Sequence, residues 1–330
     1  MNSVMQTWER ACADSALLRF VDILLRGTGQ VMFQNHPLTG LLFLTAIAWG
    51  SLAAGAGTVL FGGLLGLVAA TLTALWLRVD AEGLAAGLYG YNGLLVGLAL
   101  PTFLAPSPML WACVALGAAV SVVALLGTAN VTRGWGVSAL TFPFVLTTWL
   151  LLLAAYAFAG LGGEPPPFAG ELEALESAAS NPLDLAAFVG GVLHSISQVF
   201  LKGNTVSALL FLAGLALSSR AAALFAVGGA LLAVTSAHLL GAESELVSAG
   251  LLGFSPVLTA VALGTVFYRP GWRVAAYAAL GTVFTVVAQA AMNVAFAPLG
   301  LPALTAPFVL CTWLFLLPQQ HLQDDGNGRR

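Results

Sequence analysis

Two threonines stand beside breaks in their helices, where a hydroxyl group could take part in hydrogen-bonding chemistry. The segments ALTFPFVLTTWL (Ala139–Leu150) and ALTAPFVLCTWL (Ala303–Leu314) lie 164 residues apart and agree at ten of twelve positions. A proline follows both Thr141 and Thr305 by two residues, and a helical proline frees a carbonyl about four residues earlier. Each hydroxyl would then lie beside unpaired backbone polarity, ready to bond a polar solute. The alternative is a hydroxyl that bonds a carbonyl of its own helix, as is common in membrane threonines.

Two glutamines form a second polar pair. Gln30 lies in GQVMFQNHPLTGLLFL and Gln198 in SQVFLKGNTVSALLFL, and these segments agree at six of sixteen positions. An amide is costly in lipid, and polar side chains at membrane depth face the interior of a helix bundle. We therefore predict that the glutamines border a solute path, with Phe33 and Val199 beside them. Amide bonds that merely join helices are the alternative.

Apolar residues at matching positions are predicted to form the walls of that path. GLYGYNGLLVGLAL (87–100) and GLLGFSPVLTAVAL (250–263) agree at six of fourteen positions, and an aromatic residue in each precedes a leucine by four residues. On a helix this spacing places both side chains on one face. Ordinary core packing is the alternative. The predicted wall residues are Tyr91, Leu95, Phe254 and Leu258, together with Val145 and Val309, which follow the threonines by four.

The ionisable residues form no catalytic or metal-binding pattern. Glu82 and Glu245 are the only paired carboxylates, and each stands five residues before the first glycine of its segment. A negative charge there suits the positive end of a helix dipole, so capping is favoured over a proton or cation site. The four histidines and three cysteines lack metal-ligand spacing. We therefore expect neither an enzyme nor a cofactor.

Composition places most of the chain in lipid. Of its 330 residues, 59% are hydrophobic and 8% charged, and mean hydropathy is +0.94, whereas soluble domains are about 25% charged. The net charge of −3, without a basic run, argues against a nucleic-acid partner. The apolar runs are continuous and rich in Leu, Ala and Gly, which favours packed membrane helices over the alternating strands of a barrel.

The expected fold class is an all-α polytopic membrane protein with two similar halves. Each half has five apolar runs near the roughly 20 residues that a bilayer requires. A shorter, glycine-rich stretch between the third and fourth runs fits a re-entrant half-helix, because broken backbone at membrane depth needs protein or water around it. The expected spans are 18–35, 38–56, 58–77, 109–130, 138–160, 187–203, 206–220, 222–241, 273–294 and 301–318, with half-helices near 83–93 and 246–256.

An odd number of spans per half would bring the second half into the membrane from the opposite side. The halves, 1–163 and 186–320, would then be inverted-topology repeats with the pore at their interface. The linker 164–185 contains prolines and acidic residues but neither Lys nor Arg, and most arginines fall on the other side. The positive-inside rule predicts an extracytoplasmic linker, cytoplasmic termini and a polar cytoplasmic tail at 321–330.

Neutral donors and acceptors between apolar walls suit a small, neutral, polar solute, because an ion would need counter-charges at membrane depth. The paired motifs resemble the urea transporter family over essentially the whole chain. They are GLYGYNGLLVG with its degenerate copy GLLGFSPVL, the glutamines in GQVMF and SQVF, and the twin LTxPF sequences. The compact two-repeat length resembles bacterial members, which implies the inner membrane.

The resemblance implies a passive, channel-like urea pathway through each protomer of a homotrimer in membrane lipid. It implies that Thr141 and Thr305 narrow the centre of the pore, that Gln30 and Gln198 lie near two outer binding positions, and that the apolar residues named above are its walls. The carbonyls of 88–91 and 251–254 would form ladders of acceptors.

One departure from the family pattern and one competing function remain. The second copy has Ser255–Pro256 where the first has Asn92–Gly93, which breaks strict symmetry. The competing function is a proton- or sodium-coupled carrier of a small neutral solute such as a short amide, and that carrier would need Glu82 and Glu245.

Overall fold

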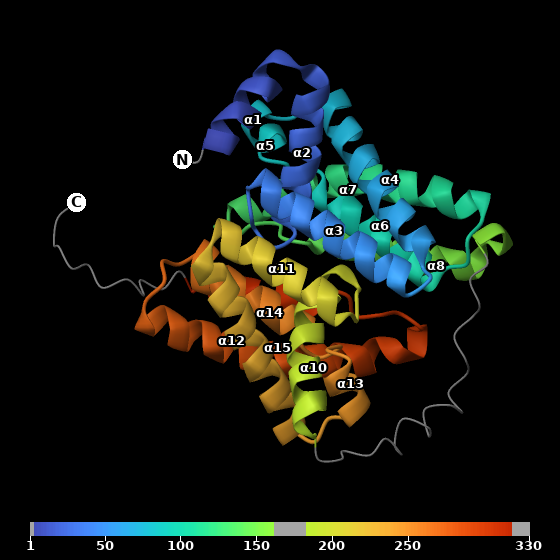
Figure 1. The fold of residues 1–330 in the computed structure, drawn as a ribbon. Coiled ribbons are helices and arrows are strands. Elements are labelled where there is room, and N and C mark those ends of the chain that lie inside the picture. Colours follow the sequence, from blue (N-terminus) through green and yellow to red (C-terminus); the bar gives the residue numbers. More distant parts are fainter. Residues whose placement is uncertain (1–2, 162–182, 319–330) are drawn as a thin grey trace.

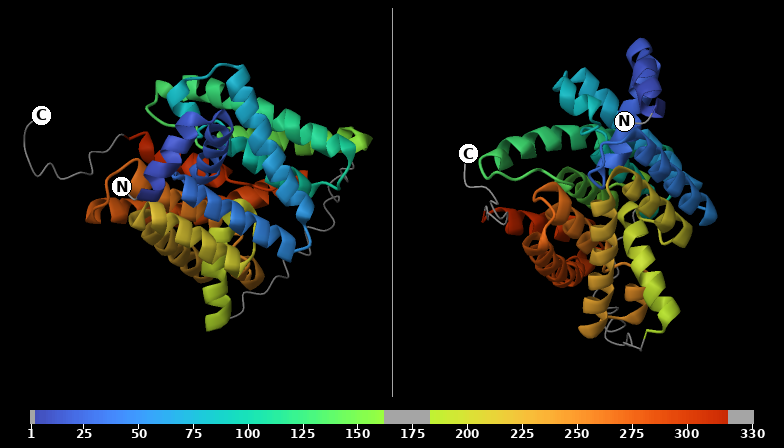
Figure 2. Two further views of the ribbon diagram at one scale, coloured as in Figure 1. Left: turned by 45° about the horizontal axis from the view of Figure 1, so that its top comes forward. Right: turned by 60° about the vertical axis from the view of Figure 1, so that its left-hand side comes forward.

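The computed structural model describes residues 3–161 and 183–318, and every regular element within these ranges is a helix (Figure 1). The all-α prediction is confirmed for this part of the chain. The two halves lie side by side, the first coloured blue to green and the second yellow to red (Figures 1 and 2). The predicted tail 321–330 and almost all of the predicted linker 164–185 lie outside the described residues.

Four of the described helices are long and apolar enough to cross a membrane. A fifth candidate is the pair formed by α10 with η3 (Gln198–Phe200) and α11, which bends by 72° at its break. The remaining apolar helices are shorter. The four are α4 (Gly57–Trp76), α7 (Pro108–Arg133), α12 (Arg220–Leu239) and α15 (Trp272–Phe296), which η5 (Ala297–Leu299) extends. The bent pair consists of α10 (Leu185–Ser197) and α11 (Thr205–Ser218). The shorter apolar helices are α3 (Pro37–Ala53), α6 (Tyr91–Phe103), α8 (Phe142–Ala157), α14 (Phe254–Val261) with the turn that follows it, and α16 (Ala306–Leu316).

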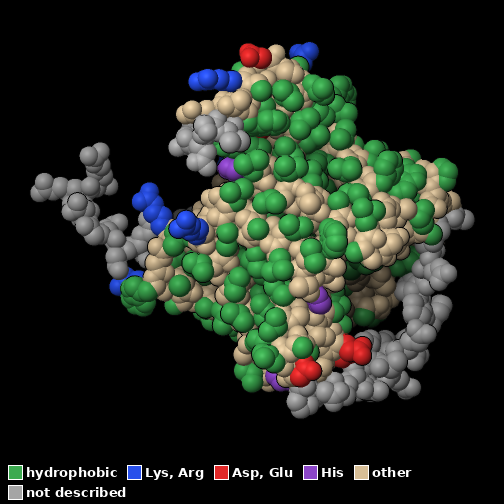
Figure 3. All heavy atoms as spheres, in the orientation of Figure 1, with side chains coloured by type: hydrophobic (Ala, Val, Ile, Leu, Met, Phe, Trp, Pro, Cys, Tyr) green, Lys and Arg blue, Asp and Glu red, His purple; other side chains and the backbone are tan. Residues whose placement is uncertain are grey.

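The outer surface of these helices is apolar. Leu52, Leu116, Leu224 and Leu280 are each more than half exposed, as are several other large apolar side chains. Figure 3 shows apolar side chains across the visible face, with charged groups gathered at its margins. Such a surface is stable only in contact with lipid, so the chain is a polytopic membrane protein.

The charges that interrupt the first predicted span have partners within the protein. The helix α1 (Ser3–Asp14) packs on α2 (Ala16–Gln30). The Trp8 indole donates to Asp22 at 2.7 Å, and Arg26 forms an ion pair with the same carboxylate at 2.6 Å. The helix α2 has 15 residues and three charged side chains, and it is not one of the four candidate spans, which have 20 residues or more.

The structure differs from the prediction of a single half-helix near 83–93 and near 246–256, because each range holds a short helix, a turn and the start of a longer helix that runs beyond it. In the first half they are α5 (Ala81–Ala85) and α6 (Tyr91–Phe103). In the second they are α13 (Ser244–Ser248) and α14 (Phe254–Val261), followed by a π-helical turn, η4 (Ala262–Val266). Gly87 and Gly250 turn the chain with φ of 75° and 74°. A Cβ at either glycine would overlap a backbone nitrogen of α2 or α10, so no other residue allows this approach.

Four hydrogen bonds between the two halves form two reciprocal pairs. Thr39 Oγ1 on α3 donates to the Gly214 carbonyl on α11 at 2.9 Å, and Ser207 Oγ on α11 donates to the Ala46 carbonyl on α3 at 2.8 Å. The first bond has its donor in the first half and its acceptor in the second, and the second bond has the reverse. The Trp149 indole likewise donates to the Pro302 carbonyl at 2.8 Å.

The equivalent bond in the other half is made by the Trp313 indole, which donates to the Ser138 carbonyl at 2.7 Å. These bonds hold the start of α8 beside the start of α16.

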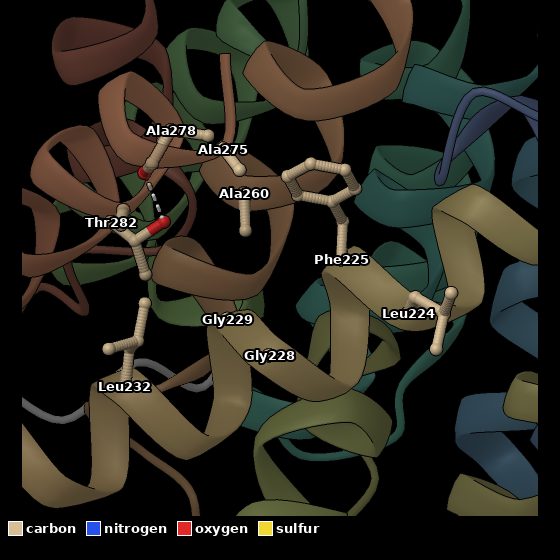
Figure 4. Close-up of a pocket in the computed structure, with 10 residues that line it drawn as sticks. Leu224, Phe225, Gly228, Gly229, Leu232, Ala260, Ala275, Ala278 and Thr282 are labelled. Carbon is tan, nitrogen blue, oxygen red and sulfur yellow. Dashed lines mark hydrogen bonds between the residues drawn. The ribbon is translucent and has the colours of Figure 1, made fainter. Parts of the chain in front are cut away.

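An apolar pocket of about 300 Å³ lies between α12, α14 and α15 (Figure 4). Its only hydroxyl belongs to Thr282, which donates to the Ala278 carbonyl of its own helix at 2.7 Å. The pocket therefore presents no free polar side chain to a polar solute, and the functional site must be sought elsewhere.

The close packing of α4 on α6 yields a testable prediction. A Cβ at Gly66 would overlap the Gly93 carbonyl of α6, whereas a Cβ at Gly127 on α7 meets nothing within 4 Å. Gly66→Ala should lower the stability by about 1–3 kcal/mol through overpacking, although alanine gains about 1 kcal/mol in helix propensity. Thermal unfolding of purified protein in detergent measures the change. Gly127→Ala is the matched control and should be neutral or stabilising; equal stability of the two variants would contradict the packing argument.

Candidate functional site

The hydroxyls of Thr141 and Thr305 meet at the centre of the protein. Their oxygens lie 2.7 Å apart, and the residues are 3% and 4% exposed. Each threonine is the N-cap residue of its helix, α8 or α16, and neither side chain caps that helix. The alternative in which each hydroxyl bonds its own helix is therefore wrong. The two bond each other across 164 residues of sequence.

The prolines act differently from the prediction. Pro143 and Pro307 lie in the first turns of α8 and α16, where a proline removes no intrahelical bond. The carbonyl four residues before Pro143, that of Ala139, accepts from the Phe142 amide at 3.2 Å, and Ala303 is bonded likewise by Ala306. The prolines therefore mark helix starts, and the expectation that they free these carbonyls was wrong.

The carbonyls that do need partners belong to the leucines before the threonines. Leu140 and Leu304 have φ of 53° and 52°, a left-handed conformation that is costly for a leucine. The Tyr91 hydroxyl of α6 donates to the Leu140 carbonyl at 2.6 Å. In the second half Phe254 has no hydroxyl, and Ser255 Oγ donates to the Leu304 carbonyl at 3.4 Å instead. The departure at Ser255 thus supplies the hydroxyl that Phe254 lacks.

In the first half, Asn92 of α6 makes a further contact with the start of α8. Its side-chain oxygen accepts from the Phe144 amide of α8 at 3.1 Å, which satisfies one of the open donors at the start of that helix. Sequence reasoning missed the roles of Asn92 and Ser255. The only available signal was the mismatch between the two copies at this point.

Both glutamines join elements of the fold. Gln30 Nε2 donates to the Ala86 carbonyl at 2.8 Å, and Gln198 Nε2 donates to the Ala249 carbonyl at 3.2 Å. Each bond ties the end of α2 or α10 to the turn that precedes α6 or α14. One N–H of each amide is thereby used within the protein.

A cavity of about 70 Å³ brings four of the predicted residues together on one side of the threonine pair. The Phe33 ring lies edge-on to Phe308, with centroids 6.1 Å apart, so the cavity has an aromatic wall that both halves support. The lining residues are Gln30, Val31, Phe33, Leu88, Tyr91, Ser138, Leu140 and Thr141.

The other predicted wall residues lie in the hydrophobic core around the threonines and do not line this cavity. Phe254 matches Tyr91 in being 9% exposed. The remaining five are at most 2% exposed: Leu95, Val145, Val199, Leu258 and Val309.

Four carbonyls in the turns remain open acceptors. Within the described ranges, no protein donor bonds the carbonyls of Leu88 and Tyr89 before α6, or those of Leu251 and Leu252 before α14. An open carbonyl can accept an N–H group from a solute. Leu88 and Leu251 are 42% and 37% exposed, so these turns lie at the surface of the chain.

The N-cap residue of α5, the short helix before α6, is Asp80 and not Glu82. The Asp80 carboxylate accepts from the Gly83 amide at 2.6 Å and from the Tyr89 hydroxyl, and the bond from Tyr89 lowers the pKa of Asp80. Glu82 and Glu245 lie in the first turns of α5 and α13, where negative charge suits the helix dipole. In the part of the chain that the structure describes, no three His, Cys, Asp or Glu side chains gather as metal ligands.

The fold and the site together define a membrane protein whose buried centre offers neutral hydrogen-bonding groups. A model of the urea transporter family matches residues 21–320, and the chain belongs to that family. Urea transporter 1 of Capra hircus is 32% identical over 311 residues, covering 91% of this chain and 77% of the relative. Urea transporter 1 of Rattus norvegicus is 30% identical over 317 residues with the same coverage. The family consists of transporters and not of enzymes.

The hydrogen bond from the Tyr91 hydroxyl to the Leu140 carbonyl can be tested by removing the hydroxyl. Tyr91→Phe removes the buried donor to Leu140, so the stability should fall by about 1 kcal/mol. Tyr156→Phe is the matched control, because that hydroxyl bonds the Gly300 carbonyl at 3.2 Å in an exposed position and should contribute less. Thermal unfolding of both variants measures the difference. An equal or smaller loss for Tyr91→Phe would show that the Leu140 carbonyl does not depend on this bond.

Proposed function

We propose that the protein transports urea down its concentration gradient through a channel-type pore within each protomer. The observation that carries this proposal is the buried contact between the Thr141 and Thr305 hydroxyls, which can open to bond a passing solute. Two hydroxyls supply donors and acceptors without charge. A neutral, planar molecule with one carbonyl and four N–H groups can exchange its water for such partners, and weak binding permits rapid conduction.

The surroundings of the threonine pair favour a neutral solute over a cation. The helices α8 and α16 both begin at the threonines, so their positive dipole ends point at the constriction and disfavour cations. Open carbonyls in the turns before α6 and α14 can accept N–H groups of urea. The residues proposed to bind urea or line the pore are Gln30, Phe33, Tyr91, Leu95, Thr141, Val145, Gln198, Val199, Phe254, Leu258, Thr305 and Val309.

The proposed architecture is two inverted repeats, 1–163 and 186–320, each with five spans and a half-helix near 83–93 or 246–256. Reciprocal bonds between α3 and α11 support it, because exchanged contacts are what a two-fold axis produces. The nearly equal backbone angles of the two N-cap threonines, φ −92° and −94°, are further support. The pore lies at the interface of the repeats.

The proposed membrane orientation places both termini and the tail 321–330 in the cytoplasm and the acidic linker 164–185 outside. We propose a bacterial inner membrane as the location. The active form is a homotrimer embedded in lipid.

The competing function, an ion-coupled carrier of a small neutral solute, is separated from the channel by one experiment. Stopped-flow light scattering on proteoliposomes measures the rate of urea entry with and without proton or sodium gradients. The channel requires fast entry driven by urea alone. Entry that follows an imposed ion gradient would establish the carrier, and rates equal to those of empty liposomes would exclude urea transport.

The threonine pair provides the sharpest test of the pore. The double variant Thr141→Val with Thr305→Val removes two hydroxyls, each bond to the solute being worth about 1 kcal/mol. Urea flux should fall about tenfold or more, since about 1.4 kcal/mol changes a rate tenfold. Thr147→Val is the control, because Thr147 is equally buried on α8 but bonds the Pro143 carbonyl of its own helix. Unchanged flux in a correctly assembled double variant would remove the threonines from the pathway.

A further inference from the structure

A second cavity, of about 430 Å³, lies where the end of α3, the start of α4, the end of α6 and the connection from η3 to α11 meet. Its volume falls within the roughly 300–1,000 Å³ typical of small-molecule sites. It differs from the apolar pocket of Figure 4 in having a charged side chain in its wall. The lining residues are Gly50, Ala53, Ala54, Ala56, Val59, Pro101, Thr102, Leu201, Lys202, Gly203 and Asn204.

The charged residue in this wall is Lys202, which is 5% exposed. Its stem packs along α3, because a Cβ at Gly50 would lie 3.2 Å from Lys202 Cδ. Within residues 3–161 and 183–318, its ammonium group has neither a hydrogen-bond acceptor nor an ion-pair partner. The ammonium is therefore largely removed from solvent and lies in the cavity wall without a counter-charge, which is costly, so a counter-ion in the cavity would stabilise it.

A second donor in the same cavity is the side-chain amide of Asn204. Its oxygen caps α11 by accepting from the Ser207 amide at 3.0 Å. The cap fixes the direction of the NH₂ group, which bonds no other described residue. The Thr102 hydroxyl already donates to the Leu98 carbonyl at 2.7 Å.

The wall carries one positive charge and none of its lining residues is acidic. A ligand with one negative charge would therefore balance it. The ammonium and the amide are two separate donors in the lining of one cavity, which suits an anion with two acceptor oxygens.

We infer that this cavity is a binding site for a small monovalent oxyanion of the carboxylate type, held by Lys202 and Asn204. The site does not depend on the proposed urea transport. It adjoins Gln198, because a Cβ at Gly203 would lie 3.3 Å from Gln198 Nε2. A bound anion would thus lie beside one end of the proposed pathway.

The test uses the purified full-length protein in a neutral detergent and acetate as the probe. Saturation-transfer difference NMR on the acetate methyl group, at constant ionic strength, yields the affinity. The wild type should show saturable binding, and Lys202→Met, which keeps the length of the stem and removes the charge, should bind at least tenfold more weakly. Arg220→Gln is the control, because Arg220 is an exposed cation outside this cavity and its loss should leave binding unchanged.

A second variant separates binding from folding. Asn204→Asp keeps an oxygen that can cap α11, while it replaces the NH₂ donor with a negative oxygen. It should also weaken acetate binding at least tenfold, with thermal stability retained, and it decides the matter alone if Lys202→Met does not fold. The inference is overturned if the wild type shows no saturable transfer, or if either folded variant binds acetate like the wild type.

Discussion

Backbone polar groups at the apolar centre of this protein need hydrogen-bond partners, and the rest of the site depends on that requirement. The helices α8 and α16 begin there, so their first amides and the preceding carbonyls cannot be satisfied by water in lipid. Asn92 accepts a hydrogen bond from one amide, and the hydroxyls of Tyr91 and Ser255 donate to the carbonyls of Leu140 and Leu304. Because side chains of α6 and α14 supply these partners, these two helices and the starts of α8 and α16 hold each other in place.

The two threonine hydroxyls are free to contact each other because other side chains already bond the neighbouring backbone groups. A threonine at an N-cap position usually accepts from an amide of its helix, but Thr141 and Thr305 leave that role unfilled and face each other. The indoles of Trp149 and Trp313 bond carbonyls of the opposite half and keep the two helix starts together. In the proposed pore, the hydroxyls could therefore separate for a solute without unfolding the helix ends.

Charge is confined to places where the fold can balance it. Asp22 and Arg26 pair at the surface of α2, and Asp80 caps α5 at the edge of the apolar region. The described core around the threonines holds hydroxyls, amides and carbonyls instead. Lys202 is the exception, as a buried ammonium in a cavity wall. A neutral centre with charge at its margins is the arrangement that the proposed transport of a neutral solute requires.

Composition and long apolar runs were sufficient to predict the all-helical membrane class, because hydropathy depends on residue type alone. The twin motifs also identified Thr141 and Thr305 and the Gln30 and Gln198 pair, since repetition is visible in a sequence. Only the tertiary structure decided which atom each hydroxyl bonds, because the partner lies 164 residues away and its position depends on how the two halves pack. For the same reason the use of Ser255 in place of the missing tyrosine hydroxyl could not be read from local patterns.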